Sequence, residues 1–434
     1  HRIPYHTTLC IVLLITLVVS GGKLAHGATW HVDPIHGNDG NTGNTWLQSF
    51  ESLQTALENV SLAQGDLIKV AQGTYLTNPT ADDDGVVTHA ERLATFDIPT
   101  RITIEGGYKG VGADGDASDA NDRNPELYPT ILSGDLKQDG PDLLTECNTF
   151  GDNAYHVVTN TVSSAIEPVI IDGVTISGGY TGQTQDGCDT SSPPSVNDAN
   201  GAGVHNTGRL LLIDCTVTHN VTDGGIGGGV YNGPGGNLTA WNCWFFANNA
   251  SKANTAIGRG AAVGGVGTSQ NESNITIVNS LFELNSAGDA PDSCQSRNPN
   301  HGACLYYEGN ANSGLVEVTN CTIVRSTAGG AIQLIGDGVQ FILKNSVVDT
   351  HEGIDLVSNC TQCANIILVD SAFHDEAGSS GCDQELSANG VTRLGSNVDL
   401  SLSDTHAMTG LSIRFQEGRN SRGIIDGGGD LVDD

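Results

Sequence analysis

Apolar and polar positions alternate in short runs between Leu210 and Phe373, and each run ends at an Asn or Asp that is followed by a small residue. Apolar residues stand four and two positions before each of these Asn or Asp residues, and another stands three positions after it. This alternation predicts a strand with one buried face, and Asn or Asp then predicts a turn through the left-handed conformation. The six pairs are Asp214-Cys215, Asn242-Cys243, Asn279-Ser280, Asn320-Cys321, Asn345-Ser346 and Asp370-Ser371.

The six pairs are separated by 28, 37, 41, 25 and 25 residues, which indicates a minimal coil of 25 residues with insertions in the longer copies. Such a coil cannot bury its own core and must stack on its neighbours. A third apolar strand completes each coil, and its copies begin at Gly203, Gly229, Ala261, Ala303, Ala331 and Gly353. Three short strands per coil predict an all-β protein, a right-handed parallel β-helix whose corner asparagines hydrogen-bond along the axis.

The small residues that follow the corners are predicted to point inward. Cys215, Cys243, Ser280 and Cys321 would then be small core residues rather than reactive thiols.

The two ends of the chain do not follow the repeat. Residues 1–27 are predicted to be a signal peptide, because an apolar run of eleven residues, Cys10–Ser20, follows Arg2, and Ala25 and Gly27 suit a cleavage site. The alternative is a single membrane anchor. Residues 385–434 lose the pattern and form a C-terminal cap or a linker.

Residues 28–65 form an N-terminal cap in this interpretation. Leu53, Ala56, Leu57 and Val60 share one face of a helix expected over 47–63, which would cover a first coil that begins at 67–70. The β-helix itself is expected over 66–384, with about four irregular coils up to about residue 180 and regular coils after that.

Several short motifs resemble known β-helix families. Gly329-Gly330-Ala331-Ile332 is a GGAI motif, and 245–248 and 282–285 are FxxN motifs, as in the repeats of polymorphic outer-membrane proteins. The N-terminal half, with 70–75 and 171–179 among its cues, is similar to secreted bacterial proteins of the pectate-lyase-like β-helix superfamily. The resemblance implies the fold and a surface-exposed protein, and it is weak for activity.

The charge excludes some partners. The chain has 50 Asp and Glu against 18 Lys and Arg, a net charge of −32. This argues against binding to nucleic acid and to anionic membranes. With the signal peptide removed, no membrane insertion is expected, and the predicted location is the bacterial extracellular space or the cell surface.

Ten cysteines remain beyond the signal peptide, where disulfides persist. Local spacing suggests three sets of disulfide candidates: Cys294 with Cys304, Cys147 with Cys188, and a pair among Cys360, Cys363 and Cys382. The CxxC at 360–363 lacks a second pair of zinc ligands nearby, so a disulfide is favoured over a metal there.

The long insertions all precede the third strand of a coil, so stacking would place them along one side of the rod. The sequence predicts a shallow ligand groove beside that strand, where aromatic side chains would stack on a polysaccharide or a cell-surface glycan. The alternative is an ordinary solvated surface. The outward-facing candidates are His205, Tyr231, Tyr306, Glu308, Gln333 and Asp355.

Catalytic residues are harder to find. A polysaccharide lyase needs basic side chains, and Lys252, Arg259, Arg297, Arg325 and Lys344 do not recur at matching positions of neighbouring coils. A glycoside hydrolase needs converging carboxylates, and Glu308 and Asp355 lie two coils apart.

The sequence therefore favours a secreted scaffold for adhesion or glycan binding without chemistry of its own. The alternatives are a polysaccharide lyase or glycoside hydrolase acting in the groove, and a structural subunit that self-assembles into an extracellular filament.

One loop suggests calcium. Asp114, Asp116, Ser118, Asp119 and Asp122 place oxygen ligands close together, as Ca²⁺ loops do, although the EF-hand spacing of Gly and Glu is missing. The alternative is an acidic surface turn.

Overall fold

The computed structural model describes most of residues 27–287 and, from 302 onward, mainly the strands. The gaps before residue 287 are 60, 81–86, 113, 141–150, 164–166, 183–198 and 252–257. The predicted signal peptide therefore lies almost entirely outside the described residues. Within the described part of the chain, no helix is long and apolar enough to cross a membrane.

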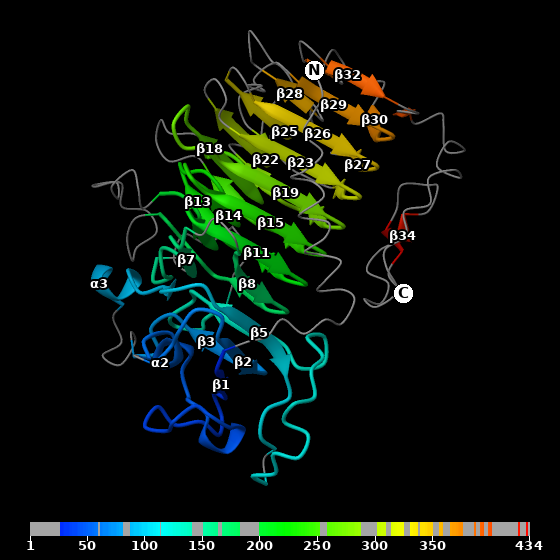
Figure 1. Ribbon diagram of the computed structural model, residues 1–434. Helices are drawn as coiled ribbons and strands as arrows, with labels where there is room; N and C mark the ends of the chain where they lie inside the picture. The colour runs from blue at the N-terminus through cyan, green and yellow to red at the C-terminus, as the bar shows by residue number, and fades with distance from the viewer. Residues whose placement is uncertain are drawn as a thin grey trace.

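The chain winds repeatedly through three long parallel sheets, I, II and III, in that order, and builds a rod (Figure 1). Sheet I contains β1 (Thr29–Val32), β2 (Leu67–Ala71), β5 (Thr103–Tyr108), β8 (Val169–Asp172), β11 (Arg209–Ile213), β15 (Asn237–Trp241), β19 (Asn274–Val278), β23 (Leu315–Thr319), β26 (Gln340–Lys344), β29 (Asn365–Val369) and β32 (Val391–Leu394).

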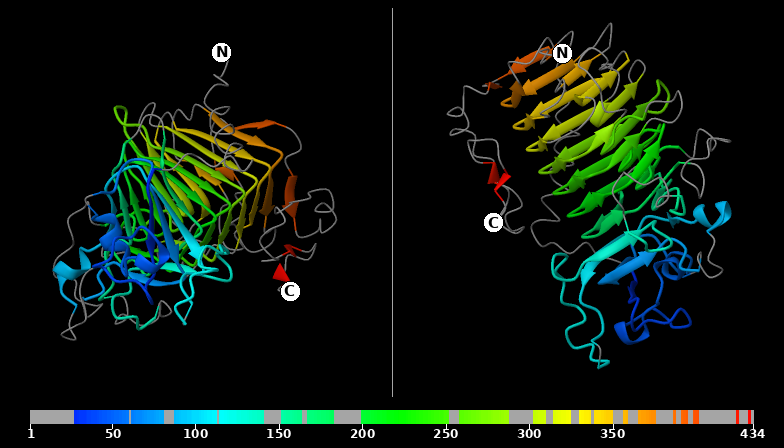
Figure 2. Two further views of the ribbon diagram at one scale, coloured as in Figure 1. Left: turned by 60° about the horizontal axis from the view of Figure 1, so that its bottom comes forward. Right: turned by 180° about the vertical axis from the view of Figure 1, so that it is seen from behind.

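Sheet II contains β3 (Gly73–Leu76), β6 (Thr130–Ser133), β9 (Thr175–Ser177), β12 (Thr216–Thr218), β16 (Trp244–Phe246), β20 (Leu281–Glu283), β24 (Thr322–Val324), β27 (Val347–Asp349), β30 (Ala372–Asp375) and β33 (Val398–Ser401). Sheet III contains β4 (Phe96–Ile98), β7 (Val158–Asn160), β10 (Val204–Asn206), β14 (Val230–Asn232), β18 (Val263–Gly267), β22 (Gly302–Gly309), β25 (Gly330–Ile335), β28 (Leu356–Ser358) and β31 (Leu386–Ser387). This order of parallel strands confirms the predicted right-handed parallel β-helix, and Figure 2 shows the stacked coils from two further sides.

The six predicted corners between sheets I and II have the expected backbone. Asp214, Asn242, Asn279, Asn320, Asn345 and Asp370 all have positive φ, between 45° and 55°. Their side chains hydrogen-bond along the axis: Asn345 Nδ2 donates to Asn320 Oδ1 (2.7 Å), and Asn320 Nδ2 donates to Asn279 Oδ1 (3.2 Å). The predicted asparagine ladder is therefore confirmed.

Two further ladders lie inside the rod at the other corners. Asn206 Nδ2 donates to Asn232 Oδ1 (2.6 Å), and Asn248 Nδ2 donates to Asn285 Oδ1 (3.1 Å). All four of these side chains are fully buried, and their amides satisfy backbone groups that the turns leave unpaired. Asn248 and Asn285 are the last residues of the FxxN motifs, so the ladder explains why the motif ends in Asn.

The residues that the alternation predicts to point inward do form the core. The inward residues around the corners are at most 2% exposed, Cys215, Cys243, Ser280 and Cys321 among them. Burial raises the pKa of the Cys321 thiol to about 12, as expected for an inert core residue. Phe245 and Phe282 stack with their ring centroids 4.8 Å apart on successive coils.

The order of elements also has features that the sequence did not suggest. A short extra sheet follows sheet II in three coils, formed by β13 (Val221–Asp223), β17 (Asn249–Ser251) and β21 (Ser286–Ala287). Near the C-terminus, β34 (Ile424–Ile425) and β35 (Leu431–Val432) form an antiparallel pair.

The N-terminal cap differs from the prediction. The helix expected over 47–63 is replaced by a 3₁₀ turn, η1 (Trp46–Gln48), and the short helix α2 (Leu53–Leu57). The helix α2 begins after Ser52 because the Ser52 hydroxyl caps it by accepting from Thr55 N. Leu53, Ala56 and Leu57 do pack into the core as predicted.

The predicted first coil, the predicted number of irregular coils and the predicted end of the β-helix were also wrong. The strand at Leu67 is not the first of its sheet, since β1 precedes it and pairs with it. Residues 66–180 form two coils and the first two strands of a third, not about four coils, because the segments between strands are long. A second short helix, α3 (His89–Arg92), occupies one of them. At the other end, β31, β32 and β33 add strands to all three sheets beyond residue 385.

Candidate functional site

Four of the six predicted groove residues lie on the outward face of sheet III and share one row, whereas Glu308 lies two positions farther along its strand and pairs with Val266 and Ile335. His205 pairs in register with Tyr231, Tyr231 with Gly264, Gly264 with Tyr306, and Tyr306 with Gln333. The same row continues toward the N-terminus through Thr159 and Asp97. Sequence analysis missed these two residues because the irregular coils hide their register.

The row is less exposed than an open groove requires. Tyr231 is 8% exposed, Gln333 is 1% and Tyr306 is 0%. The described ends of the insertions cover the row: Ile226 and Arg259 form a parallel bridge between successive coils, and a Cβ at Gly264 would overlap the Ile226 side chain. The expected open aromatic surface is therefore wrong at these three positions. Asp355 lies outside the described residues.

Glu308 belongs to a polar group with the buried Tyr306 and the partly exposed Arg259, and its own side chain is about half exposed. Arg259 Nη1 donates to the Tyr306 hydroxyl (2.8 Å), which donates to Glu308 Oε2 (2.7 Å). The guanidinium also lies 5.2 Å from the centre of the Tyr306 ring. Burial raises the pKa of Tyr306, and the bond to Glu308 adds to this effect. These contacts fasten the segment that carries Arg259 onto the sheet, although Arg259 Nε is buried without a hydrogen-bond partner among the described residues.

The N-terminal part of the row is more open. The His205 ring meets the His156 ring edge to face and lies tilted against the Tyr231 ring, with 5.2 Å between ring centres in each case. Backbone carbonyls of Gly201 and Asn200 contact Nδ1 of His156 and of His205. Both histidines stay partly exposed. Their rings therefore form a fixed, partly accessible aromatic surface.

A hollow of about 390 Å³ lies at the beginning of this row, between α2 and β4. Its lining includes polar and apolar residues: Gln54, Leu57, Glu58, Asn59, Leu62, Thr95, Asp97, Pro99 and Thr100. Asp97 Oδ1 accepts from the Thr159 hydroxyl (3.1 Å), which connects the hollow to the row. The hollow and the row together form the candidate site.

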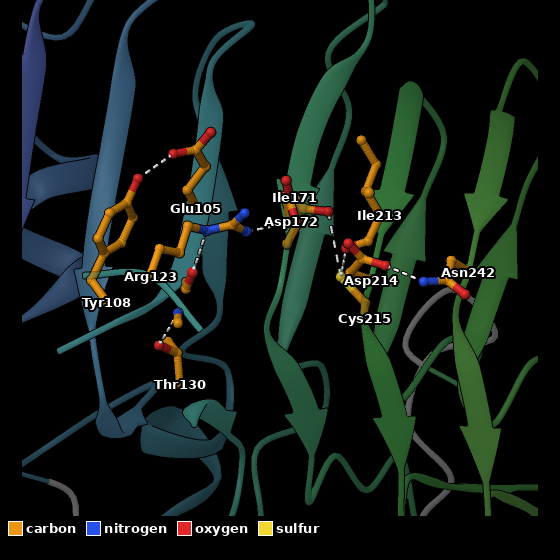
Figure 3. A network of polar contacts seen from close by, with 12 residues as sticks. Glu105, Tyr108, Arg123, Thr130, Ile171, Asp172, Ile213, Asp214, Cys215 and Asn242 are labelled. Atoms are coloured by element: carbon orange, nitrogen blue, oxygen red, sulfur yellow. Dashed lines mark hydrogen bonds and ion pairs between the residues drawn. The ribbon is translucent and has the colours of Figure 1, made fainter. Parts of the chain in front are cut away.

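A second polar cluster lies on sheet I, and sequence analysis missed it (Figure 3). Arg123 Nη2 contacts Asp172 Oδ1 (2.6 Å), and the Tyr108 hydroxyl donates to Glu105 Oε2 (2.6 Å). Glu105 and Asp172 are register partners on adjacent strands. Arg123 comes from the long segment between β5 and β6, so no local pattern could connect it with Asp172.

The electrostatics of this cluster are unusual. Burial raises the pKa of Asp172 to about 6, although the Arg123 guanidinium acts in the opposite direction; Asp214 and Glu105 add to the rise. Burial also raises the pKa of Tyr108. Each carboxylate already has a partner within the cluster, so this arrangement stabilises the coils more obviously than it offers a reactive group.

In the sequence, Asp172-Gly173 also resembles an Asx-small pair of the repeat, but the apolar residues that follow it are offset by one position. Asp172 pairs with Ile213, one position before the corner Asp214. Gly173 therefore occupies the corner, with φ of 69°. This explains why the apolar residues after Asp172 are offset by one from the repeat.

The predicted calcium loop is held by its own backbone. Asp116 Oδ1 accepts from Ser118 N (2.8 Å), Asp114 Oδ1 accepts from Asp116 N (3.1 Å), and Asp119 pairs with Lys109 (3.2 Å). The Asp122 carbonyl accepts from Lys109 N. Across the described residues, no three His, Cys, Asp or Glu side chains are grouped to hold a metal. Calcium at this loop stays a prediction.

The disulfide predictions lie mostly outside the described residues, which do not include Cys147, Cys188, Cys294, Cys360, Cys363 and Cys382. Cys304 is described and is fully buried in the main core.

Comparisons with known proteins show only distant similarity. No family model and no curated protein matches the sequence. Among solved structures, pectate lyase Pel9A is similar with a TM-score of 0.38 and 13% identity, over 95% of this chain and 89% of that chain.

Two other solved structures show likeness at the same level. The polygalacturonase from Erwinia carotovora has a TM-score of 0.33 and 13% identity, over 88% of this chain and 96% of that chain. The pectin methylesterase from Aspergillus niger has a TM-score of 0.33 and 12% identity, over 88% of each chain. The strand register of the chain itself establishes its fold, and no activity follows from similarities this distant.

Proposed function

We propose that this chain is a secreted or cell-surface scaffold that binds a polysaccharide along the outer face of sheet III and does not cleave it. One observation carries the proposal: Asp97, Thr159 and His205 occupy one register row that leads out of the hollow beside α2. Parallel strands repeat every 4.8 Å or so, and the row therefore presents polar side chains at regular intervals. A linear polymer of repeating sugars matches such a surface.

The chemistry of the row supports binding. Carboxylate, hydroxyl and imidazole groups hydrogen-bond to sugar hydroxyls, and the partly exposed rings of His156 and His205 offer apolar faces to a sugar ring. Two carboxylates with fixed partners support a non-catalytic role: Glu308, which stays about half exposed, accepts from Tyr306, and Asp172 on sheet I pairs with Arg123.

One observation favours glycoside hydrolysis as a second candidate. Glu58 and Asp97 both line the hollow, and a pair of carboxylates across a bound sugar is what hydrolysis requires. In that case Glu58→Gln and Asp97→Asn would each abolish turnover.

The test incubates the purified chain with a panel of acidic and neutral polysaccharides. Retention on each polymer, release of reducing ends and ultraviolet absorbance of unsaturated uronates are measured together. We expect retention without turnover. Thr159→Ala and His205→Ala should each weaken retention, by about tenfold if one good hydrogen bond or stacking contact is lost.

Thr276→Ala is the matched control, because Thr276 is a half-buried threonine on sheet I, away from the row. Its retention should equal that of the unaltered chain. Turnover of any polymer would replace the proposal with the hydrolase or lyase alternative, and absence of retention on every polymer would contradict both.

A further inference from the structure

A buried acidic group at the junction between β6 and β7 has no role in the site described above. Asp135 follows β6, and Asp152 and Asn153 precede β7. The two segments are joined by a hydrogen bond from Ala154 N to the Gly134 carbonyl (2.7 Å). Asp135 is 7% exposed, Asp152 is 6% and Asn153 is 0%.

Most side-chain polar atoms of this group have no hydrogen-bond partner among the described residues. Both carboxylate oxygens of Asp152, the Oδ1 of Asp135 and both amide atoms of Asn153 are buried without a hydrogen-bond partner. Only Oδ2 of Asp135 is bound, by Gly140 N (3.1 Å). A buried carboxylate without partners is strongly unfavourable, and proteins normally pair such a group or let it coordinate a metal.

The nearest basic side chains do not neutralise Asp152. Arg92 lies close by, but its three hydrogen bonds go to the carbonyls of Asn153, Tyr180 and Gly182. Lys137 is exposed and lowers the pKa of Asp152 only in part.

We propose that Asp135, Asp152 and Asn153 form a Ca²⁺ site that fastens the segment before β7 to the end of β6. The donors on offer are carboxylate oxygens and one amide oxygen, the hard ligands that Ca²⁺ takes, with backbone carbonyls or water completing the shell. Mg²⁺ fits less well because it demands compact octahedral geometry and keeps most of its water. The site is separate from the exposed loop at 114–122.

The experiment measures thermal unfolding of the full chain, first with chelator and then with increasing CaCl₂, and counts bound calcium by titration calorimetry. The unaltered chain should unfold several degrees higher in calcium, as one site saturates. Asp152→Asn should lose this shift. In chelator the variant should unfold at the same temperature as the unaltered chain or higher, since it removes an unpaired buried charge.

Glu272→Gln is the control, a change of one exposed carboxylate to its amide far from this junction, and it should retain the full calcium shift. Asp116→Asn tests the exposed loop separately, and the part of the shift that Asp152→Asn loses should remain in it. Asp135→Asn gives a second variant if Asp152→Asn fails to fold. Three results would overturn the proposal: no effect of calcium on the unaltered chain, a full calcium shift in both buried variants, or a shift that is lost in Asp116→Asn alone. An equal shift with MgCl₂ would overturn the assignment to calcium.

Discussion

The two halves of this rod stabilise the contacts between successive coils in different ways. From β10 onward, the corners between sheets I and II repeat one solution, an Asn or Asp with positive φ whose side chain contacts the next coil. Before β10, single contacts between distant segments hold the coils together, such as Arg123 with Asp172 and Arg92 with three carbonyls.

This difference shows which residues determine the contacts between coils in each half. A ladder needs only one residue type at a fixed place in every coil, so insertions elsewhere do not disturb it. In the N-terminal half, the segment that carries Arg123 lies over the corner at Gly173, where a Cβ would come within 2.7 Å of Arg123 Nη2. A covered corner excludes the ladder residue, and the covering segment supplies the stabilising contacts instead.

The largest effect is expected from removing the Arg92 side chain. Arg92 is 2% exposed, donates to three carbonyls and lies 4.1 Å from the centre of the Tyr155 ring. Arg92→Ala leaves these carbonyls without a donor, so the free energy of unfolding should fall by about 3–5 kcal/mol. Arg92→Lys should recover part of this loss. Urea unfolding measures the change.

The comparison predicts that this damage stays local, because coils contact mainly their neighbours. Amide exchange should accelerate around β7 and remain unchanged in β15–β26. The control is Lys344→Ala in the regular half, where a partly exposed pair with Glu317 is lost and about 1 kcal/mol or less is expected. Equally accelerated amide exchange along the whole rod would show that the two halves unfold as one unit. It would contradict the view that they are stabilised independently.

Asp172 provides the next test, through pH. Its pKa in the folded protein is raised to about 6, so the folded state binds the proton more tightly than the unfolded state does. The stability that this proton contributes is complete below pH 4 or so and is lost as the pH rises through 6. Asp172→Asn resembles the protonated form. The variant should therefore match the unaltered chain at low pH and exceed it by about 3 kcal/mol at neutral pH.

Urea unfolding of both proteins between these pH values measures the difference, and Asp122→Asn in the exposed loop is the control. The groups that face Asp172 are Arg123, Glu105 and Asp214, and all three remain in the variant. A constant difference across the range would mean that Arg123 balances the burial of Asp172, and an advantage of the variant that falls as the pH rises would mean that Arg123 outweighs it. In either case the cluster would be an ordinary ion pair.

The sequence was informative where the structure repeats and silent where it does not. Six corners with one local pattern of apolar residues before and after them predicted the strands, the left-handed turns and the exposed ladder. The row on sheet III was also placed correctly, since His205 and Tyr231 follow the same repeat. The burial of Tyr306 was not predictable, because Arg259 reaches it from an insertion of irregular length. Likewise, Arg123 and Asp172 are 49 residues apart, and nothing local connects them.

The smallest effects are expected from exchanging the corner residues of the two halves, glycine at the covered corner and asparagine in the ladder. These variants test most directly why the two halves differ. Gly173→Asn gives the covered corner a ladder residue, which must displace Arg123 or Pro125 and should cost about 2 kcal/mol.

Asn242→Gly keeps the left-handed corner without strain and loses only the contact with Asp214, so about 1 kcal/mol is expected. Asn242→Ala should cost more than Asn242→Gly, because alanine tolerates positive φ poorly. If Gly173→Asn leaves the free energy of unfolding unchanged, the segment that carries Arg123 and Pro125 can move aside at little cost. The corner at residue 173 would then tolerate a ladder asparagine. The cause of the difference between the halves would then lie in the length of the inserted segments alone.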